Sequence, residues 1–122
     1  MTDVFAHIEG LQPIELGEGL VARAVGGERM TFAVVDLEPH AVLPQHQHEN
    51  EQIGLIVQGE MRLTVGLETK VLRPGDTYVI PGNVPHTAQA GADGASVVDV
   101  FTPPRADWES RPRREATKPH WP

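Results

Sequence analysis

Short stretches of strand-forming residues, each closed by glycine or proline, recur at nearly regular spacing along most of this chain. Clear examples are residues 30–37, 53–57, 77–80 and 96–101, which are rich in β-branched and other strand-favouring residues. The 122 residues include 12 Gly and 11 Pro, a density that favours turns over long helices. We therefore predict an all-β fold, a sandwich or barrel with an aliphatic core, because only 5% of the residues are aromatic.

The strand pattern divides the chain into three parts. Residues 1–19 are a mixed N-terminal arm, residues 20–105 are the expected barrel, and residues 106–122 are a tail rich in Pro and Arg. The prolines forbid a continuous helix in the tail. We expect the tail either to be flexible or draped over the surface, or to lie as a strap on an acidic partner or a second subunit.

Two glycine-containing stretches within the central part are expected to be turns. Residues 58–60 read Gln-Gly-Glu and separate two strand-like runs, and residues 91–94 read Gly-Ala-Asp-Gly before the last run. Glycine readily adopts the backbone angles of tight turns. We therefore expect a turn at residues 58–60 and a hairpin tip at residues 91–94.

Charge and composition exclude several classes of protein. The formal net charge is −7, so the basic surface that nonspecific nucleic-acid binding requires is not expected. The chain shows no signal-peptide pattern at its start and no apolar stretch long enough to span a bilayer. Cysteine is absent, which suits a reducing cytoplasm. We expect a soluble cytoplasmic protein that binds neither nucleic acid nor membrane.

The segment 46–60 carries the chemistry of the chain. Alternate residues of an extended segment point to the same side, so His46 and His48 can aim their rings at one point. Gln52 opens the next extended run, and its side-chain oxygen can reach back to that point. His86, at the end of a Pro-rich stretch, is the candidate for a fourth ligand. These residues predict a metal site; the alternative is a pair of surface histidines beside an ordinary hairpin.

The oxygen ligand is open to more than one assignment. Glu49 or Glu51 could take the place of Gln52, and Glu51 would lower the electrophilicity of the ion. Gln52 is preferred because it shares strand parity with Gly54. Nitrogen and oxygen ligands suit one divalent ion, which could be Ni, Zn, Fe, Mn or Co.

These residues resemble the two motifs of the cupin superfamily. The first is His-x-His followed by Glu or Gln and then Gly, and the second is Gly, a Pro-rich turn and His; the matching residues are His46, His48, Gln52, Gly59, Gly75, Pro81 and His86. The resemblance covers about residues 32–105. It implies a small antiparallel jelly-roll barrel with the metal inside its mouth, often assembled as a homodimer.

The end of the barrel carries a narrower resemblance. Residues 99–105 read Asp-x-Phe-x-Pro-x-Arg, an ending similar to that of the cupins that linearise unsaturated uronates and of monocupin polyketide cyclases. In the uronate-linearising group these side chains line the pocket. The resemblance therefore implies that Asp99, Phe101 and Arg105 line the pocket here.

Roles for these side chains follow from their chemistry. Asp99 is the best candidate for a general acid or base, and Arg105 could clamp a substrate carboxylate. Alternatively, Asp99 is a solvent-facing residue bonded to an Arg, and Arg105 forms a surface salt bridge. Tyr78 is either a core residue, a hydroxyl that supports the site, or a catalyst.

Three functions are consistent with such a site. The first is a metal-dependent isomerase, lyase or cyclase that activates an oxygen-rich small molecule, such as a sugar acid or a polyketide, by Lewis acidity. The second is a metal-dependent oxygenase on the same fold. The third is a cupin that binds a small ligand without catalysis.

Overall fold

The computed structural model describes residues 3–122, and it confirms the all-β prediction. Eight antiparallel strands form the sheet, and two short 3-10 helices flank it. The elements are η1 (Ile8–Gly10), β1 (Ile14–Gly17), β2 (Leu20–Gly26), β3 (Thr31–Leu37), β4 (Val42–His46), β5 (Glu51–Val65), β6 (Glu68–Leu72), β7 (Thr77–Ile80), β8 (His86–Thr102) and η2 (Ala106–Ser110). No helix in the described part of the chain is long and apolar enough to cross a membrane.

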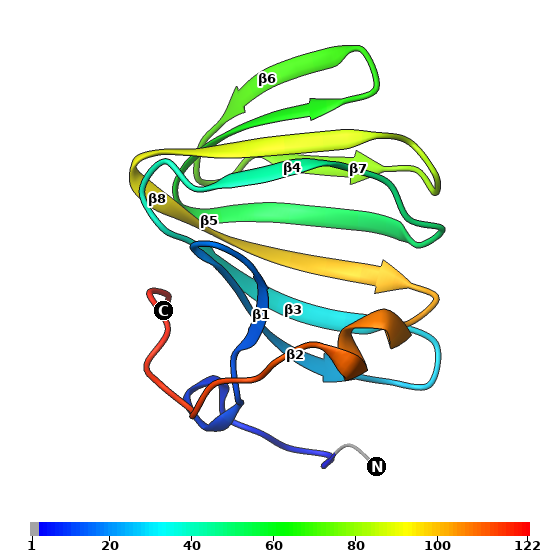
Figure 1. Cartoon of the computed structure of the whole chain (residues 1–122), viewed down its shortest axis with the longest axis vertical. Helices are drawn as coiled ribbons and strands as arrows, with labels where there is room; N and C mark the ends of the chain where they lie inside the picture. The colour runs from blue at the N-terminus through cyan, green and yellow to red at the C-terminus, as the bar shows by residue number, and fades with distance from the viewer. Residues whose placement is uncertain (1–2) are drawn as a thin grey trace.

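The two longest strands, β5 and β8, organise the sheet. The strand order is β1-β2-β3-β8-β5-β6, with β4 paired to β8 and β7 paired to β5. The first part of β8 pairs with β4 and its second part pairs with β3, so this strand continues from one layer into the other. The sheet therefore curls around its own inner face (Figure 1).

The turn predicted at residues 58–60 and the hairpin tip predicted at residues 91–94 were both wrong. Both stretches lie within the continuous strands β5 and β8, where the register shifts around Gly59. Gly59 and Gly94 have φ of 73° and 75°, and a side chain at Gly59 would collide with the Gly94 carbonyl oxygen. A single glycine with positive φ can form a bulge that bends a strand without ending it, and the sequence alone does not distinguish the two outcomes.

Strand alternation places one set of side chains inside the curled sheet. Along β5, Gln52, Gly54 and Ile56 are buried, whereas Ile53 and Leu55 between them face outward. The inner face is filled mainly by aliphatic residues from all layers. A mostly aliphatic interior with a few inward polar residues positions the candidate site.

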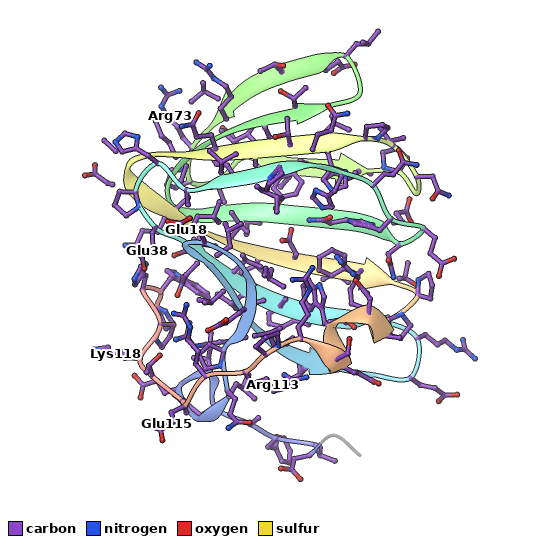
Figure 2. All side chains as sticks on the ribbon, in the orientation of Figure 1. Glu18, Glu38, Arg73, Arg113, Glu115 and Lys118 are labelled. Atoms are coloured by element: carbon purple, nitrogen blue, oxygen red, sulfur yellow. The ribbon has the colours of Figure 1, made fainter. Side chains whose placement is uncertain are left out.

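The C-terminal tail packs along its own barrel. In Figure 1 it runs beside β1 and β2, and the Glu15 amide donates to the Pro112 carbonyl at 2.9 Å. Trp108 in η2 is buried. Figure 2 shows Glu115 and Lys118 pointing away from the sheet, and both are exposed. The tail thus covers part of the outer face of the sheet.

A buried ion pair lies beneath the tail. Arg23 Nη1 donates to Asp36 Oδ2 at 3.0 Å, and both side chains are almost fully buried. Ser96 donates to the other Asp36 oxygen, Arg23 Nη2 donates to Thr117, and the His120 amide donates to Asp36. These bonds anchor the end of the tail to β2 and β3.

Candidate metal centre and active site

Three histidines from separate segments meet at one end of the barrel. His46 ends β4, His48 follows in the loop, and His86 begins β8, where it pairs directly with His46. One ring nitrogen from each residue lies within 4.8 Å of the other two. The structure therefore brings together the three histidines singled out in the sequence.

Backbone carbonyls orient all three rings. The Nδ1 atoms of His46, His48 and His86 lie 2.9, 3.0 and 2.9 Å from the carbonyl oxygens of the residues two positions away. A carbonyl can only accept, so each Nδ1 carries the proton and each Nε2 keeps a lone pair. The Nε2 atoms of His48 and His86 are buried and find no partner among residues 3–122. Buried lone pairs that converge in this way fit a divalent metal ion.

Burial keeps the imidazoles of His48 and His86 neutral. It lowers the pKa of His86 to about 4, and it also lowers the pKa of His48, with a smaller contribution from the positive charge of Arg105. A metal ligand must be neutral imidazole, so both rings are in the ligating state at neutral pH.

The neighbouring polar side chains differ in direction. Gln52 is 8% exposed and lines the cavity with His46 and His86. Glu49 and Glu51 are exposed, and strand alternation directs Glu51 to the opposite face of β5 from Gln52. Of these three candidates for an oxygen ligand, only Gln52 lines the cavity beside the histidines.

A cavity of about 330 Å³ opens beside the histidines. Tyr78, Asp99, Phe101 and Arg105 all line it, as do two of the three histidines. His48 is not among the lining residues, but its ring lies edge-on to that of Phe101 at a centroid distance of 5.9 Å. The volume lies at the small end of the range typical of ligand pockets.

Asp99 and Tyr78 form a buried pair inside this cavity. Tyr78 Oη donates to Asp99 Oδ1 at 2.5 Å, and Asp99 is 4% exposed. The space they occupy depends on Gly54, because a Cβ there would overlap both side chains. Sequence reasoning did not assign a role to Gly54; a glycine in the middle of a strand was the available signal.

Burial raises the pKa of Asp99 to about 6, and the Tyr78 hydrogen bond, Gln52 and Arg105 oppose this rise. Burial and the charge of Asp99 raise the pKa of Tyr78 well above its usual value. Tyr78 therefore remains a proton donor in its hydrogen bond, while Asp99 exchanges its proton near neutral pH.

Arg105 is fixed by its neighbours. Its guanidinium lies 4.8 Å from the Phe101 ring centroid and 4.5 Å from that of Trp108. Its Nε and Nη2 donate to the Asp107 carboxylate at 3.0 and 2.9 Å, and these bonds lower the pKa of Asp107. Arg105 thus both forms a salt bridge and lines the cavity. Trp108, which completes this wall, was not identified as a site residue from the sequence.

Comparison with known proteins identifies the family. A family model described as Cupin domain matches residues 33–101, more than half of the chain. The chain belongs to the cupin family. This result confirms the predicted jelly-roll fold. The chain is also similar over most of its length to cupins of known structure.

Two solved structures illustrate the similarity. A cupin from Shewanella frigidimarina described as RmlC-like superimposes with a TM-score of 0.81 at 26% identity, covering 88% of this chain and 96% of that one. KdgF from Halomonas sp. gives a TM-score of 0.79 at 30% identity, covering 87% and 98%. Both are single chains of nearly the same extent as this cupin.

Two curated relatives are similar in sequence. The pectin degradation protein KdgF of Dickeya dadantii (strain 3937) is 26% identical over 96 residues, which cover 77% of this chain and 87% of that protein. H2HPP isomerase of Bacillus subtilis is 43% identical over 56 residues, which cover 45% of this chain and 24% of the isomerase. This cupin therefore matches only about a quarter of the length of that isomerase.

Proposed function

We propose that this cupin is a metal-dependent enzyme that carries out isomerase, lyase or cyclase chemistry on a small oxygen-bearing substrate. One observation carries the proposal. The unpartnered buried Nε2 of His86 and the buried Asp99–Tyr78 pair line a single cavity, and His48, whose Nε2 is also buried without a partner, lies in the same histidine cluster. A ligand-activating centre and a proton-transfer group lie together there.

His46, His48 and His86 would hold the ion, and Gln52 is the proposed oxygen ligand. A divalent ion at this place would supply Lewis acidity toward a substrate oxygen. Ni, Zn, Fe, Mn and Co all accept such ligands.

The side chains of the chain itself supply the remaining functions. In the proposal, Asp99 takes a proton from the substrate and returns it at another atom, because its pKa of about 6 lets both forms exist near neutrality. Tyr78 holds the accepting carboxylate in place by its hydrogen bond. Arg105 binds a substrate carboxylate, and Phe101 and Trp108 hold its guanidinium in position.

The relatives support a small-molecule enzyme. Two of the similar proteins are named KdgF, one of them a pectin degradation protein, and a third is named an isomerase. The oxygenase alternative gains no support from the site, because Glu49 and Glu51 are exposed and neither belongs to the cluster of potential metal ligands around the histidines.

A substrate screen with matched controls tests the proposal. Small sugar acids, oxo acids and polyketide fragments would be incubated with the wild-type protein and followed by NMR. We expect conversion that stops after chelator treatment and returns with one of the candidate metals. Conversion that survives chelation would contradict the proposal, and oxygen uptake with ferrous iron would favour an oxygenase.

We also propose that two copies pair through the outer face of the sheet. Phe32, Ile53 and Val79 lie in one row of paired strands around Val100, and Leu55 lies next to them. The side chains of Phe32, Ile53, Leu55 and Val79 are between 38% and 55% exposed. A sister subunit would cover this apolar surface. Light scattering should give twice the mass of the chain at micromolar concentration; a monomer mass would reject the dimer.

A further inference from the structure

The cavity is polar at one end and apolar along the rest of its length. Strand register fixes this division, because His46 pairs with His86, and three residues before His46 in β4, Leu43 pairs with Ala88. Ala88 in turn pairs with Leu63 of β5. The side chains of Leu43, Leu63 and Met61 therefore continue the cavity wall away from the histidines.

Positive charge gathers at the wall formed by the C-terminal segment. Arg105 and Arg111 both line the cavity. Asp107 pairs with Arg105, whereas Arg111 donates to the backbone carbonyls of Glu15 and Leu16 at 3.5 and 3.3 Å and forms no salt bridge within residues 3–122. Two guanidinium groups thus line the cavity, and only that of Arg105 is paired with a carboxylate among residues 3–122. The carboxylate that lines the cavity, Asp99, is bonded to Tyr78 instead. A guanidinium without a carboxylate partner beside the cavity favours an anionic ligand.

We infer that the substrate is a carboxylate with a neighbouring oxygen and an apolar body. Its carboxylate would lie at Arg105 and Arg111, its neighbouring oxygen at the histidines, and its body against Leu43, Met61 and Leu63. This inference rests on the proposed function and narrows its substrate class to acids such as alkyl or aryl 2-oxo acids.

The alternative ligand, a fully hydroxylated sugar acid, fits the apolar end poorly. Each hydroxyl placed against Leu43, Met61 or Leu63 would lose water without gaining a hydrogen bond, which is unfavourable. An alkyl or aryl group in the same place would instead bury apolar surface on both sides. The wall therefore discriminates between two acids of equal charge.

Calorimetric binding of two matched acids tests the inference. The probes are 4-methyl-2-oxopentanoate and 2-oxogluconate, which share their carboxylate and carbon number; 2-oxogluconate carries hydroxyls along its body and closes to a hemiketal in water. Metal-free protein is titrated first, so that chelation of a metal makes no contribution, and metal-loaded protein second. We expect the alkyl acid to bind at least ~10-fold tighter in both forms, a difference that a few well-buried methylenes can supply. Equal affinity, tighter binding of 2-oxogluconate, or no binding of either acid would overturn the inference.

Neighbouring residues on β4 provide a matched pair of variants. Leu43 lines the cavity, whereas Val42 is 50% exposed. Leu43→Gln should reduce the preference for the alkyl acid several-fold, and Val42→Gln should leave it unchanged. Because Leu43 is only partly buried, this substitution is compatible with folding.

The charged end of the cavity offers a second matched pair of variants. Arg111→Gln should weaken both acids several-fold, whereas Arg113→Gln, on the exposed tail, should weaken neither. If Arg111→Gln binds both acids normally, the placement of the carboxylate is wrong. Failure of the proposed function is a separate result: it would appear as absent turnover with the binding preference intact.

Discussion

Two aspartates of this cupin are buried to the same extent but have opposite surroundings. Asp36 is 3% exposed and Asp99 is 4% exposed. Asp36 lies on the outer face under the tail, where Arg23, Ser96 and the His120 amide all donate to it. Asp99 lies on the inner face, and its hydrogen bond with Tyr78 comes from a neutral group.

The comparison shows that partners, and not depth, separate a structural carboxylate from a reactive one. A buried charge with a cation and several donors is stabilised as an ion. A buried carboxyl without a paired cation is stabilised in its protonated form, and burial accordingly raises the pKa of Asp99 to about 6. The two residues should therefore respond to substitution in different ways.

The largest difference is expected in turnover. Asp99→Asn keeps the shape of the side chain and removes its ability to accept a proton, so turnover should fall by ~10² to 10⁴. Asp36→Asn should leave the turnover of the folded protein within a few-fold of wild type. The measurement is turnover at equal metal content on an accepted substrate. Near-normal turnover of Asp99→Asn would make Asp99 a structural residue as well.

Stability should show the reverse ranking. Asp36→Asn leaves the Arg23 guanidinium buried without a counter-charge, and breaking a buried pair in this way costs about 3–5 kcal/mol. Urea unfolding of the metal-free protein measures the loss. The matched double substitution Arg23→Met with Asp36→Leu should recover most of it, because no charge remains uncompensated. An unchanged unfolding midpoint in Asp36→Asn would contradict the role assigned to this pair.

A smaller effect is expected in the pH dependence of stability. The pKa of Asp99 is raised to about 6 in the folded protein, above the unfolded value of 3.8, so the native state binds more protons between these pH values. The contribution of Asp99 to the free energy of unfolding should fall as pH rises from about 4 to about 6, by at most roughly 3 kcal/mol, and then stay level. The lowered pKa values of His48 and His86 contribute a rise over the same interval, so the share of Asp99 is the difference between the wild-type profile and that of Asp99→Asn. Asp99→Asn should lose this fall, as measured by unfolding of the metal-free proteins. A parallel pH profile in both proteins would contradict the assignment.

The sequence correctly predicted those features of the site that depend on neighbouring residues along the chain. Strand parity placed Gln52 on the inner face with Gly54, and the paired motifs identified the three histidines that the structure brings together. The features that were missed depend on register between distant strands. Gly54 matters because β5 pairs it with Asp99, and Asp36 lies next to Ser96 because β3 pairs with β8.

The glycines at positions 59 and 94 were misinterpreted, because glycine with positive φ occurs both in turns and in bulges of continuous strands. Gly59 and Gly94 have the positive φ that a turn would use, but each bends a strand that continues. The packing of Trp108 on Arg105 depends on the path of the C-terminal segment past the barrel, which no local pattern specifies. Such features became visible only from the assembled sheet.

The metal content of three proteins tests the central claim most directly. Elemental analysis would compare wild type, His48→Ala and His7→Ala, since His7 is an exposed histidine outside the barrel strands. We expect about one divalent ion per chain in wild type and in His7→Ala, and loss of most of it in His48→Ala, because a ligand has been removed. Full metal content in His48→Ala, or none in wild type after loading with each candidate metal, would contradict the account.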